Sequence, residues 1–359
     1  MQNVDWLFEN ANVPIKYCIT EKHKPQRKIM EDELLKFPEV SFWLNILSNN
    51  AKVNSIKNIH GSHDYRYENI MGKLTQLGLN REISIFDRCC TFYLKFLDRQ
   101  IRMKRDKDLT ISKLYSFYDY ELLIVTFLSL AGYVDAPAVQ YVIQKRISLL
   151  YEFTKERRYD IYIDGSRYPG VKKEWQPFII DPSLYDDGNI HFPTIHDYFL
   201  FSVSIEQLNT QLQTKIDTIV NWLFDEQYEM IKRNYGYFYV PGGAYSTKAI
   251  CFKFNIPNIS ENRVNEEDIM YLLQRVYILS HFKICNYNDW FKKAIDYLKT
   301  FRNETGRYEF PRKMLTEKRD TYWIFSGHMG MGENRRKKPS NEIESTYWME
   351  KTLSNLNNK

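Results

Sequence analysis

Apolar residues recur at a spacing close to 3.6 over most of the chain, and this feature limits the possible folds more than any other. One face from Tyr67 to Leu77 is apolar at helical spacing, and Gly78 follows it as a C-terminal glycine would. The same spacing recurs over residues 83–97, 122–131, 138–153, 216–223, 266–281, 289–301 and 340–356. The sequence therefore predicts a mostly α protein whose helices pair through short glycine-containing turns.

Two segments depart from this spacing. Residues 158–197 are dense in Gly, Pro, Asp and aromatic residues, which predicts a long loop, and connections of that length are often functional. Residues 235–257 alternate between apolar and polar, which predicts a short β-hairpin turning at Gly242-Gly243. No low-complexity linker divides the 359 residues. We therefore expect one domain over 1–359.

The balance of charged residues and the cysteine count exclude some classes. Fifty basic and 45 acidic residues leave a net charge of only +5, unlike the cationic face of a dedicated nucleic-acid binder. No apolar run approaches the roughly 20 residues of a membrane helix, and no signal peptide is recognisable at the start. Five cysteines in no regular framework indicate the cytoplasm. The predicted partner is a small molecule, hydrophobic or a sugar; the oligomeric state is open.

Aromatic residues are abundant, with 27 Tyr, 22 Phe and 7 Trp making up 16% of the chain. Two explanations stay open. Such residues line semi-polar cavities as well as cores, and the codons of a low-GC bacterial genome also favour Tyr and Phe.

The stretch 324–338, IFSGHMGMGENRRKK, raises the question of nucleotide binding. Gly327 and Gly332 have the spacing of a phosphate-binding loop, but Glu333 and Asn334 stand where Lys and Ser or Thr are needed. A carboxylate at that point would repel phosphate. The stretch therefore reads as a joint between helices.

Two further stretches resemble a known helical repeat. Residues 60–97, with a helix ending at Leu77-Gly78-Leu79, are similar to the paired-helix unit of the α/α toroid, and residues 127–151 repeat the hinge at Gly132. The superfamily of this fold includes terpenoid cyclases and protein prenyltransferase β subunits. The resemblance implies inner and outer rings of helices around an aromatic-lined central cavity, with the glycine-rich joint at its rim.

The metal and acid motifs of that superfamily are incomplete here. In an Asp-x-Asp-Asp motif ending at Asp186-Asp187, Leu184 stands at the first Asp, and Ile190 stands at the last Asp of Asp-Asp-x-x-Asp. His281 and Cys285 lie one helical turn apart without a third zinc ligand. No cofactor is predicted, and Mg²⁺ and Zn²⁺ stay open.

Histidines next to carboxylates are the candidate catalytic groups, since an imidazole oriented by a carboxylate suits acid–base work near neutral pH. The candidates are His60, Asp64, Asp186, Asp187, His196 and Asp197. For Asp64 the alternative is a helix cap, and for the Asp-Gly pairs it is an ordinary turn.

Aromatic side chains near these carboxylates are the candidate substrate-binding groups, because rings steady cations and stack on sugars. They are Tyr162, Tyr168, Trp175 and Tyr185 in the long loop, with Trp348 and Glu344 one turn apart in the last helix.

Three hypotheses follow from these residues. The first is an α/α-toroid enzyme that acts on an isoprenoid or other hydrophobic substrate by Asp/His acid–base chemistry. The second is a carbohydrate-active enzyme with a carboxylate pair. The third is a non-catalytic helical-repeat binding protein.

Overall fold

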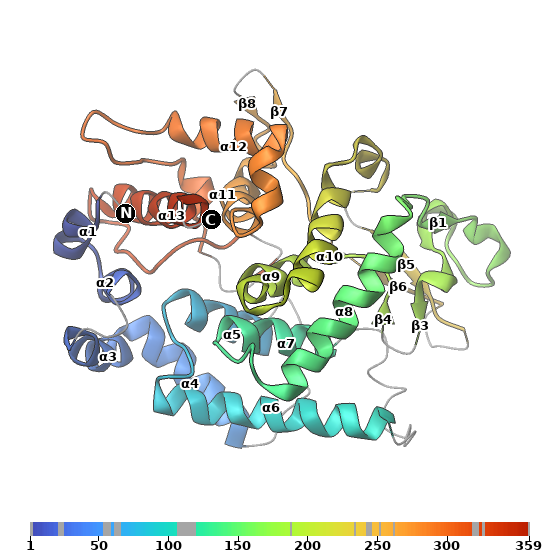
Figure 1. Ribbon diagram of the computed structural model, residues 1–359, viewed down its shortest axis with the longest axis horizontal. Helices are drawn as coiled ribbons and strands as arrows, with labels where there is room; N and C mark the ends of the chain where they lie inside the picture. Colours follow the sequence, from blue (N-terminus) through green and yellow to red (C-terminus); the bar gives the residue numbers. More distant parts are fainter. Residues whose placement is uncertain are drawn as a thin grey trace.

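Helices dominate the fold (Figure 1), and each range of helical spacing in the sequence overlaps one of them. The computed structural model describes residues 3–20, 25–52, 59–60, 66–105, 120–186, 189–232, 235–241, 246–250, 253–260, 263–317, 323–324 and 327–357. The N-terminal helices are α1 (Val4–Asn10), α2 (Val13–Ile19), α3 (Gln26–Lys36) and α4 (Pro38–Lys52). The central helices are α5 (Tyr67–Gln76), α6 (Ser84–Arg105), α7 (Tyr120–Leu130), α8 (Pro137–Lys155), α9 (Ile195–Ser204) and α10 (Thr210–Asn221). The C-terminal helices are α11 (Ile269–Leu279), α12 (Asp289–Lys299) and α13 (Ser340–Asn357). The mostly α prediction is confirmed, although α1 to α4 and α9 were not predicted.

Glycines at left-handed backbone angles end two of the paired helices. Gly78 follows α5 with a φ of 105°, and Gly132 follows α7 with a φ of 96°. Only glycine adopts this conformation without steric cost. The hinge expected after each of these helices is therefore present.

Alternate helices contact one another in chain order. α5 packs on α7, α7 on α9, α9 on α11, and α11 on α13. Of the intervening helices, α6 packs on α7, α8 on α7 and α9, α10 on α8, and α12 on α11. α13 also contacts α1, so the two ends of the chain lie side by side, as Figure 1 shows. The buried apolar residues form one continuous cluster from Leu7 to Met349.

Short strands and 3₁₀ helices occupy the rest of the described chain. β1 (Tyr162–Ile163), β2 (Ile179–Ile180), β5 (Gly236–Tyr239) and β6 (Thr247–Ile250) form one sheet in that order. Two hairpins pair β3 (Tyr185–Asp186) with β4 (Asn189–Ile190), and β7 (Ile259–Ser260) with β8 (Arg263–Val264). Short 3₁₀ helices include η2 (Gly165–Arg167), η3 (Lys173–Phe178), η4 (Pro182–Leu184), η5 (Ile205–Gln207) and η6 (Trp222–Phe224). The others are η7 (Glu226–Met230), η8 (Lys283–Tyr287) and η9 (Arg312–Leu315).

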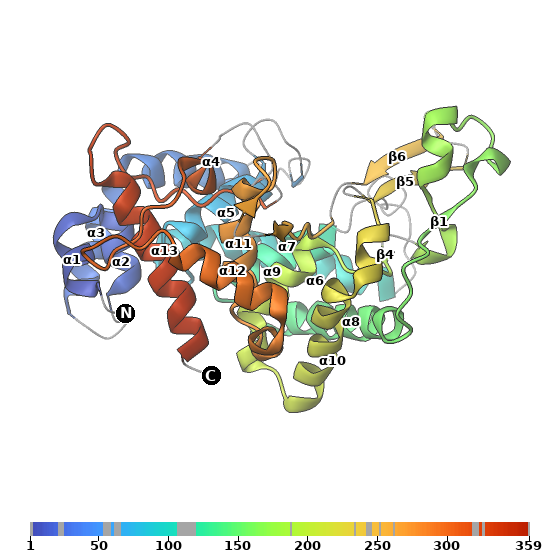
Figure 2. The same ribbon diagram turned by 90° about the horizontal axis from the view of Figure 1, so that it is seen from above.

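The antiparallel pairing of β5 with β6 is the hairpin expected over 235–257. Its predicted turn, Gly242-Gly243, lies outside the described residues. Figure 2 shows β1, β5 and β6 at one end of the molecule, far from α1, α2 and α3.

The long segment 158–197 differs from the expected loop. It contains β1 to β4 and three short 3₁₀ helices, and its last residues begin α9. Thr194 caps α9 with a reciprocal capping box to Asp197, so the helix starts at Ile195.

Candidate functional site

A cavity of about 270 Å³ lies among α2, α5, α9, α11 and α13, at the place where these helices meet the glycine-rich stretch. Its lining residues come from widely separated parts of the chain, from Tyr17 to Lys351. Ligand sites usually measure roughly 300–1,000 Å³, so this cavity suits a small molecule.

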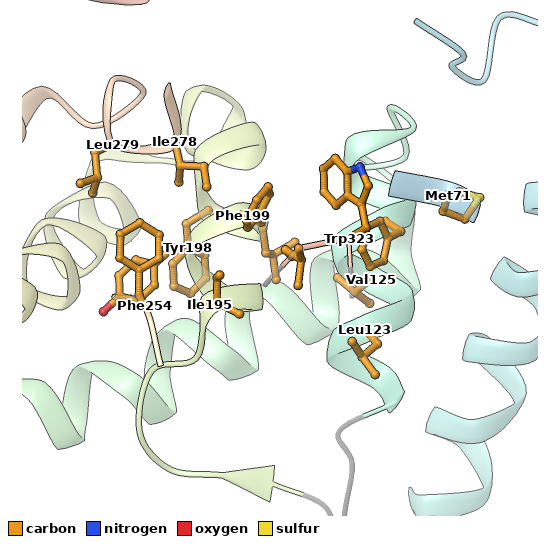
Figure 3. Packing of buried hydrophobic residues seen from close by; sticks show 14 of the residues in the cluster. Met71, Leu123, Val125, Ile195, Tyr198, Phe199, Phe254, Ile278, Leu279 and Trp323 are labelled. Atoms are coloured by element: carbon orange, nitrogen blue, oxygen red, sulfur yellow. The ribbon is translucent and has the colours of Figure 1, made fainter. Parts of the chain in front are cut away.

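Aromatic rings form much of the cavity wall. Phe199 of α9 and Trp323 face one another with ring centroids 5.6 Å apart, as Figure 3 shows. Tyr277 of α11 and Trp348 of α13 meet edge to face at 5.0 Å. The indole N–H of Trp323 donates to Gln76 Oε1 (2.9 Å), and that of Trp348 donates to Met329 O (2.6 Å). Because both indole N–H groups are satisfied by the protein, these rings offer a ligand their apolar faces.

A lysine ammonium lies within this aromatic wall. Lys351 Nζ is 5.8 Å from the ring centre of Tyr277, 5.4 Å from that of Tyr347 and 5.7 Å from that of Trp348. No carboxylate of the described residues forms an ion pair with it. Burial lowers the pKa of Lys351, but Tyr277, Tyr347 and the Cys18 thiol outweigh that effect and raise the pKa overall. The ammonium is therefore charged at neutral pH, and the faces of the three rings help to stabilise it.

A second polar group in the cavity wall lacks a partner. Gln274 is 1% exposed, and its Oε1 accepts from Arg275 Nη1. Its Nε2 has no hydrogen-bond partner among the residues that the structure describes. A buried N–H₂ left unsatisfied costs about 1–3 kcal/mol, and a ligand oxygen in the cavity would recover it.

Other polar residues of the lining are already engaged with the protein. Asn355 Nδ2 lies 3.1 Å from His281 Nε2, and His281 Nδ1 lies 3.0 Å from Tyr277 O. Both ring nitrogens of His281 therefore have neighbours within the protein. Arg27 donates to Thr20 O (2.7 Å) and covers the Tyr17 ring at 4.2 Å. The described lining contains four basic side chains, Arg27, His281, His328 and Lys351, and no Asp or Glu.

The glycine-rich stretch that contains Gly327 and Gly332 forms one side of this cavity through His328 and Met329. Glu344 of α13 stabilises this stretch, because its Oε1 accepts hydrogen bonds from Met331 N (2.8 Å) and Glu333 N (3.2 Å). Burial raises the pKa of Glu344 to about 7, although Arg335 at 2.7 Å and the two backbone N–H groups lower it. Of the two predicted substrate-binding residues of α13, Trp348 lines the cavity, whereas Glu344 binds the backbone of the glycine-rich stretch.

Side chains of α5 also form hydrogen bonds with this stretch. Lys73 Nζ donates to Gly330 O (2.9 Å) and pairs with Glu317, with Glu39 3.4 Å away. Gln76 Nε2 donates to Gly330 O as well (3.1 Å). The carbonyl of one glycine therefore receives two buried side-chain donors.

His60 and His196 are brought together by a fully buried carboxylate. Glu68 Oε2 lies 2.7 Å from His60 Nδ1, and Glu68 Oε1 lies 3.8 Å from His196 Nε2. Burial raises the pKa of Glu68, but the two histidines outweigh it and bring the pKa down to about 2. This carboxylate is therefore ionised, and neither histidine is among the described residues that line the cavity.

Asp197 forms a buried ion pair. Arg146 Nε and Nη2 donate to its two carboxylate oxygens at 2.8 and 2.9 Å, with both side chains at most 1% exposed. Its Oδ2 also accepts from Thr194 N and Thr194 Oγ1. All of these bonds stabilise the start of α9.

The predicted residues of the 158–197 segment lie in the small sheet and its 3₁₀ helices. Asp186 is bonded to Asn189 (2.7 Å) and lies 3.2 Å from His191 in an exposed hairpin. Three aromatic side chains of this segment pack on β5: Tyr168 contacts Tyr239, Trp175 stacks on Tyr237 and Tyr185 contacts Phe238. The fourth, Tyr162, contacts Phe178 of η3. Asp64 and Asp187 lie outside the described residues.

No group of three His, Cys, Asp or Glu in the described part of the chain is placed to hold a metal ion. His281 and Cys285 do lie near one another in sequence, yet the histidine is engaged as above and the thiol is buried. None of the described helices is long and apolar enough to cross a membrane. Comparison of the chain with protein families, with curated proteins and with solved structures finds no match.

Sequence reasoning missed Lys351, Gln274, Phe199 and Trp323. One local signal was available for the lysine: Tyr347 and Trp348 precede it by four and three residues in a helix, the spacing at which side chains meet. The other three meet only through the tertiary fold, and no spacing along the chain marks them.

Proposed function

We propose that the protein binds, in this cavity, a small molecule that joins an apolar or aromatic body to an anionic head. The observation that carries the proposal is Lys351, a charged ammonium among three aromatic rings with no described carboxylate as its partner. An anion at this point would gain a charge-assisted hydrogen bond, which contributes about 1.5–3 kcal/mol.

The other lining groups agree with such a ligand. Gln274 Nε2 is a second donor for an oxygen of the head, and the faces of Phe199, Trp323 and Trp348 suit an apolar body. An isoprenoid with an acidic end belongs to this class. A cationic ligand does not, because the described lining carries the cationic side chains of Arg27 and Lys351 and no Asp or Glu.

Binding is better supported than Asp/His catalysis. Asp186 and Asp197 are engaged elsewhere, and no carboxylate lines the described cavity. The closed α/α toroid stays a prediction; the ordered contacts of α5, α7, α9, α11 and α13 and the shared cavity support it.

A matched pair of probes tests the proposal. 1-Naphthylacetate carries a carboxylate on a two-ring body, and 1-naphthaleneacetamide has the same shape without the charge. We expect tryptophan fluorescence titration at pH 7 to show at least tenfold tighter binding of the acid, equal to about 1.4 kcal/mol.

Lys351→Met should abolish that preference. Lys292→Met on α12 is the control, because Lys292 is 55% exposed and away from the cavity lining. Equal affinity for the two probes in the wild type, or an unchanged preference in Lys351→Met, would contradict the proposal.

A further inference from the structure

A second, larger hollow, with a volume of about 790 Å³, lies beside the residues that precede α11. Its walls include η7, the residues from Asn265 to Asp268, and the start of α12, and the mostly buried segment from Lys253 to Asn258 forms its floor. It shares no lining residue with the aromatic cavity. A ligand here would therefore occupy a separate site.

Two buried donors lie in the floor. Lys253 and Asn255 are 6% and 8% exposed, and both line the hollow. Lys253 Nζ donates to Ile231 O (2.5 Å), which fixes its position. Asn255 Nδ2 has no hydrogen-bond partner in the part of the chain that the structure describes. This buried N–H₂ group calls for an acceptor oxygen from a ligand.

The rim carries acceptors and aromatic rings. Six carboxylate residues line the hollow: Asp225, Glu226, Glu229, Glu267, Asp268 and Asp289. Tyr287 is 79% exposed there, and Trp290 is half-buried with its indole N–H donating to Pro257 O (2.7 Å). The hollow thus offers donors at its floor, acceptors at its rim and two ring faces at one wall.

We propose that this hollow binds an oligosaccharide. Each sugar hydroxyl both donates and accepts, so one ring can satisfy Asn255 Nδ2 and also donate to rim carboxylates, while its C–H face packs on Tyr287 or Trp290. A polyamine or a lysine-rich peptide would match the rim, but its cations would meet the Lys253 ammonium at the floor. A neutral polyhydroxylated ligand can accept hydrogen bonds from the floor and donate hydrogen bonds to the carboxylates of the rim.

A glycan microarray that carries hexose and N-acetylhexosamine oligomers tests the proposal on the full-length protein. We expect binding to at least one oligosaccharide, and a loss of at least tenfold in both Tyr287→Ala and Asn255→Ala. Tyr141→Ala on α8 is the matched control, since Tyr141 is also exposed (40%) and does not line the hollow.

Thermal unfolding separates a lost site from a lost fold. Asn255→Ala should keep the wild-type melting temperature or raise it, because the side-chain amide it removes is buried without a partner for its nitrogen. Binding to no arrayed glycan, or binding unchanged in both variants, overturns the proposal. Binding of spermine or of a lysine-rich peptide that both variants lose would overturn it in favour of a cationic ligand. None of these results bears on 1-naphthylacetate, whose cavity has no residue in common with this hollow.

Discussion

Replacing Asp197 by Asn should strongly lower the free energy of unfolding of the protein. The substitution removes the charge that balances Arg146, and Arg146 is 1% exposed with its third contact, Nη1 to Ile190 O, at 2.5 Å. Removing one partner of a buried ion pair leaves the other charge uncompensated, which costs about 3–5 kcal/mol. Part of the capping box to Thr194 is also lost, in a range of about 0.5–2 kcal/mol. We therefore expect the free energy of unfolding to fall by roughly 3–5 kcal/mol or slightly more.

Urea denaturation followed by circular dichroism measures this change. Asp186→Asn is the matched control, because Asp186 is exposed in its hairpin and its pairing with His191 contributes at most about 1 kcal/mol. Arg146→Met with Asp197→Asn completes a double-mutant cycle, in which the double variant should lose at least 1 kcal/mol less than the sum of the single variants. A wild-type stability for Asp197→Asn would refute the structural role of this carboxylate.

Two other substitutions test the packing around the cavity. Glu344 has a folded-state pKa of about 7 against an ordinary 4.5, so between these pH values the folded state binds more protons, and the free energy of unfolding falls as pH rises. Glu344→Gln should reduce this pH dependence in urea denaturation at pH 5 and pH 7. An unchanged pH dependence would exclude Glu344 as its source. Gly72→Ala would place a methyl group in steric conflict with the Trp323 ring, so we expect the free energy of unfolding to fall by about 1–3 kcal/mol and the tryptophan emission to shift. A neutral or stabilising effect would mean that the Trp323 ring does not pack against α5.

The amphipathic helices were predictable because each presents one apolar face. α8 and α12 follow the spacing that the sequence shows, and glycine ends α5 where the chain must turn. α4 carries the same signal through Val40, Trp43 and Leu47, although no helix was predicted there.

Only Ile195, His196 and Asp197 of α9 fall within the predicted loop, and no helix was predicted for the rest. Residues 198–201 are all apolar or aromatic and nine of the ten residues of α9 are buried, so no single apolar face marks it as a helix. Its start depends on the Thr194 capping box and on Arg146, 51 residues earlier. No local pattern contains that ion pair.

Of the residues that line the cavity, the sequence predicted Trp348 alone as a substrate-binding residue. The central cavity of an α/α toroid, which the resemblance implies, stays a prediction. The charge of the site was not predicted, since Lys351, Gln274 and Trp323 come from separate elements that only tertiary packing brings together.

A crystal structure of the protein with 1-naphthylacetate tests the central claim most directly. The account predicts the naphthyl group against Trp323 and Trp348, with a carboxylate oxygen within hydrogen-bond distance, about 2.7–3.2 Å, of Lys351 Nζ. The second carboxylate oxygen should lie near Gln274 Nε2. Density for the probe outside this cavity, or a carboxylate turned away from Lys351, would contradict the account.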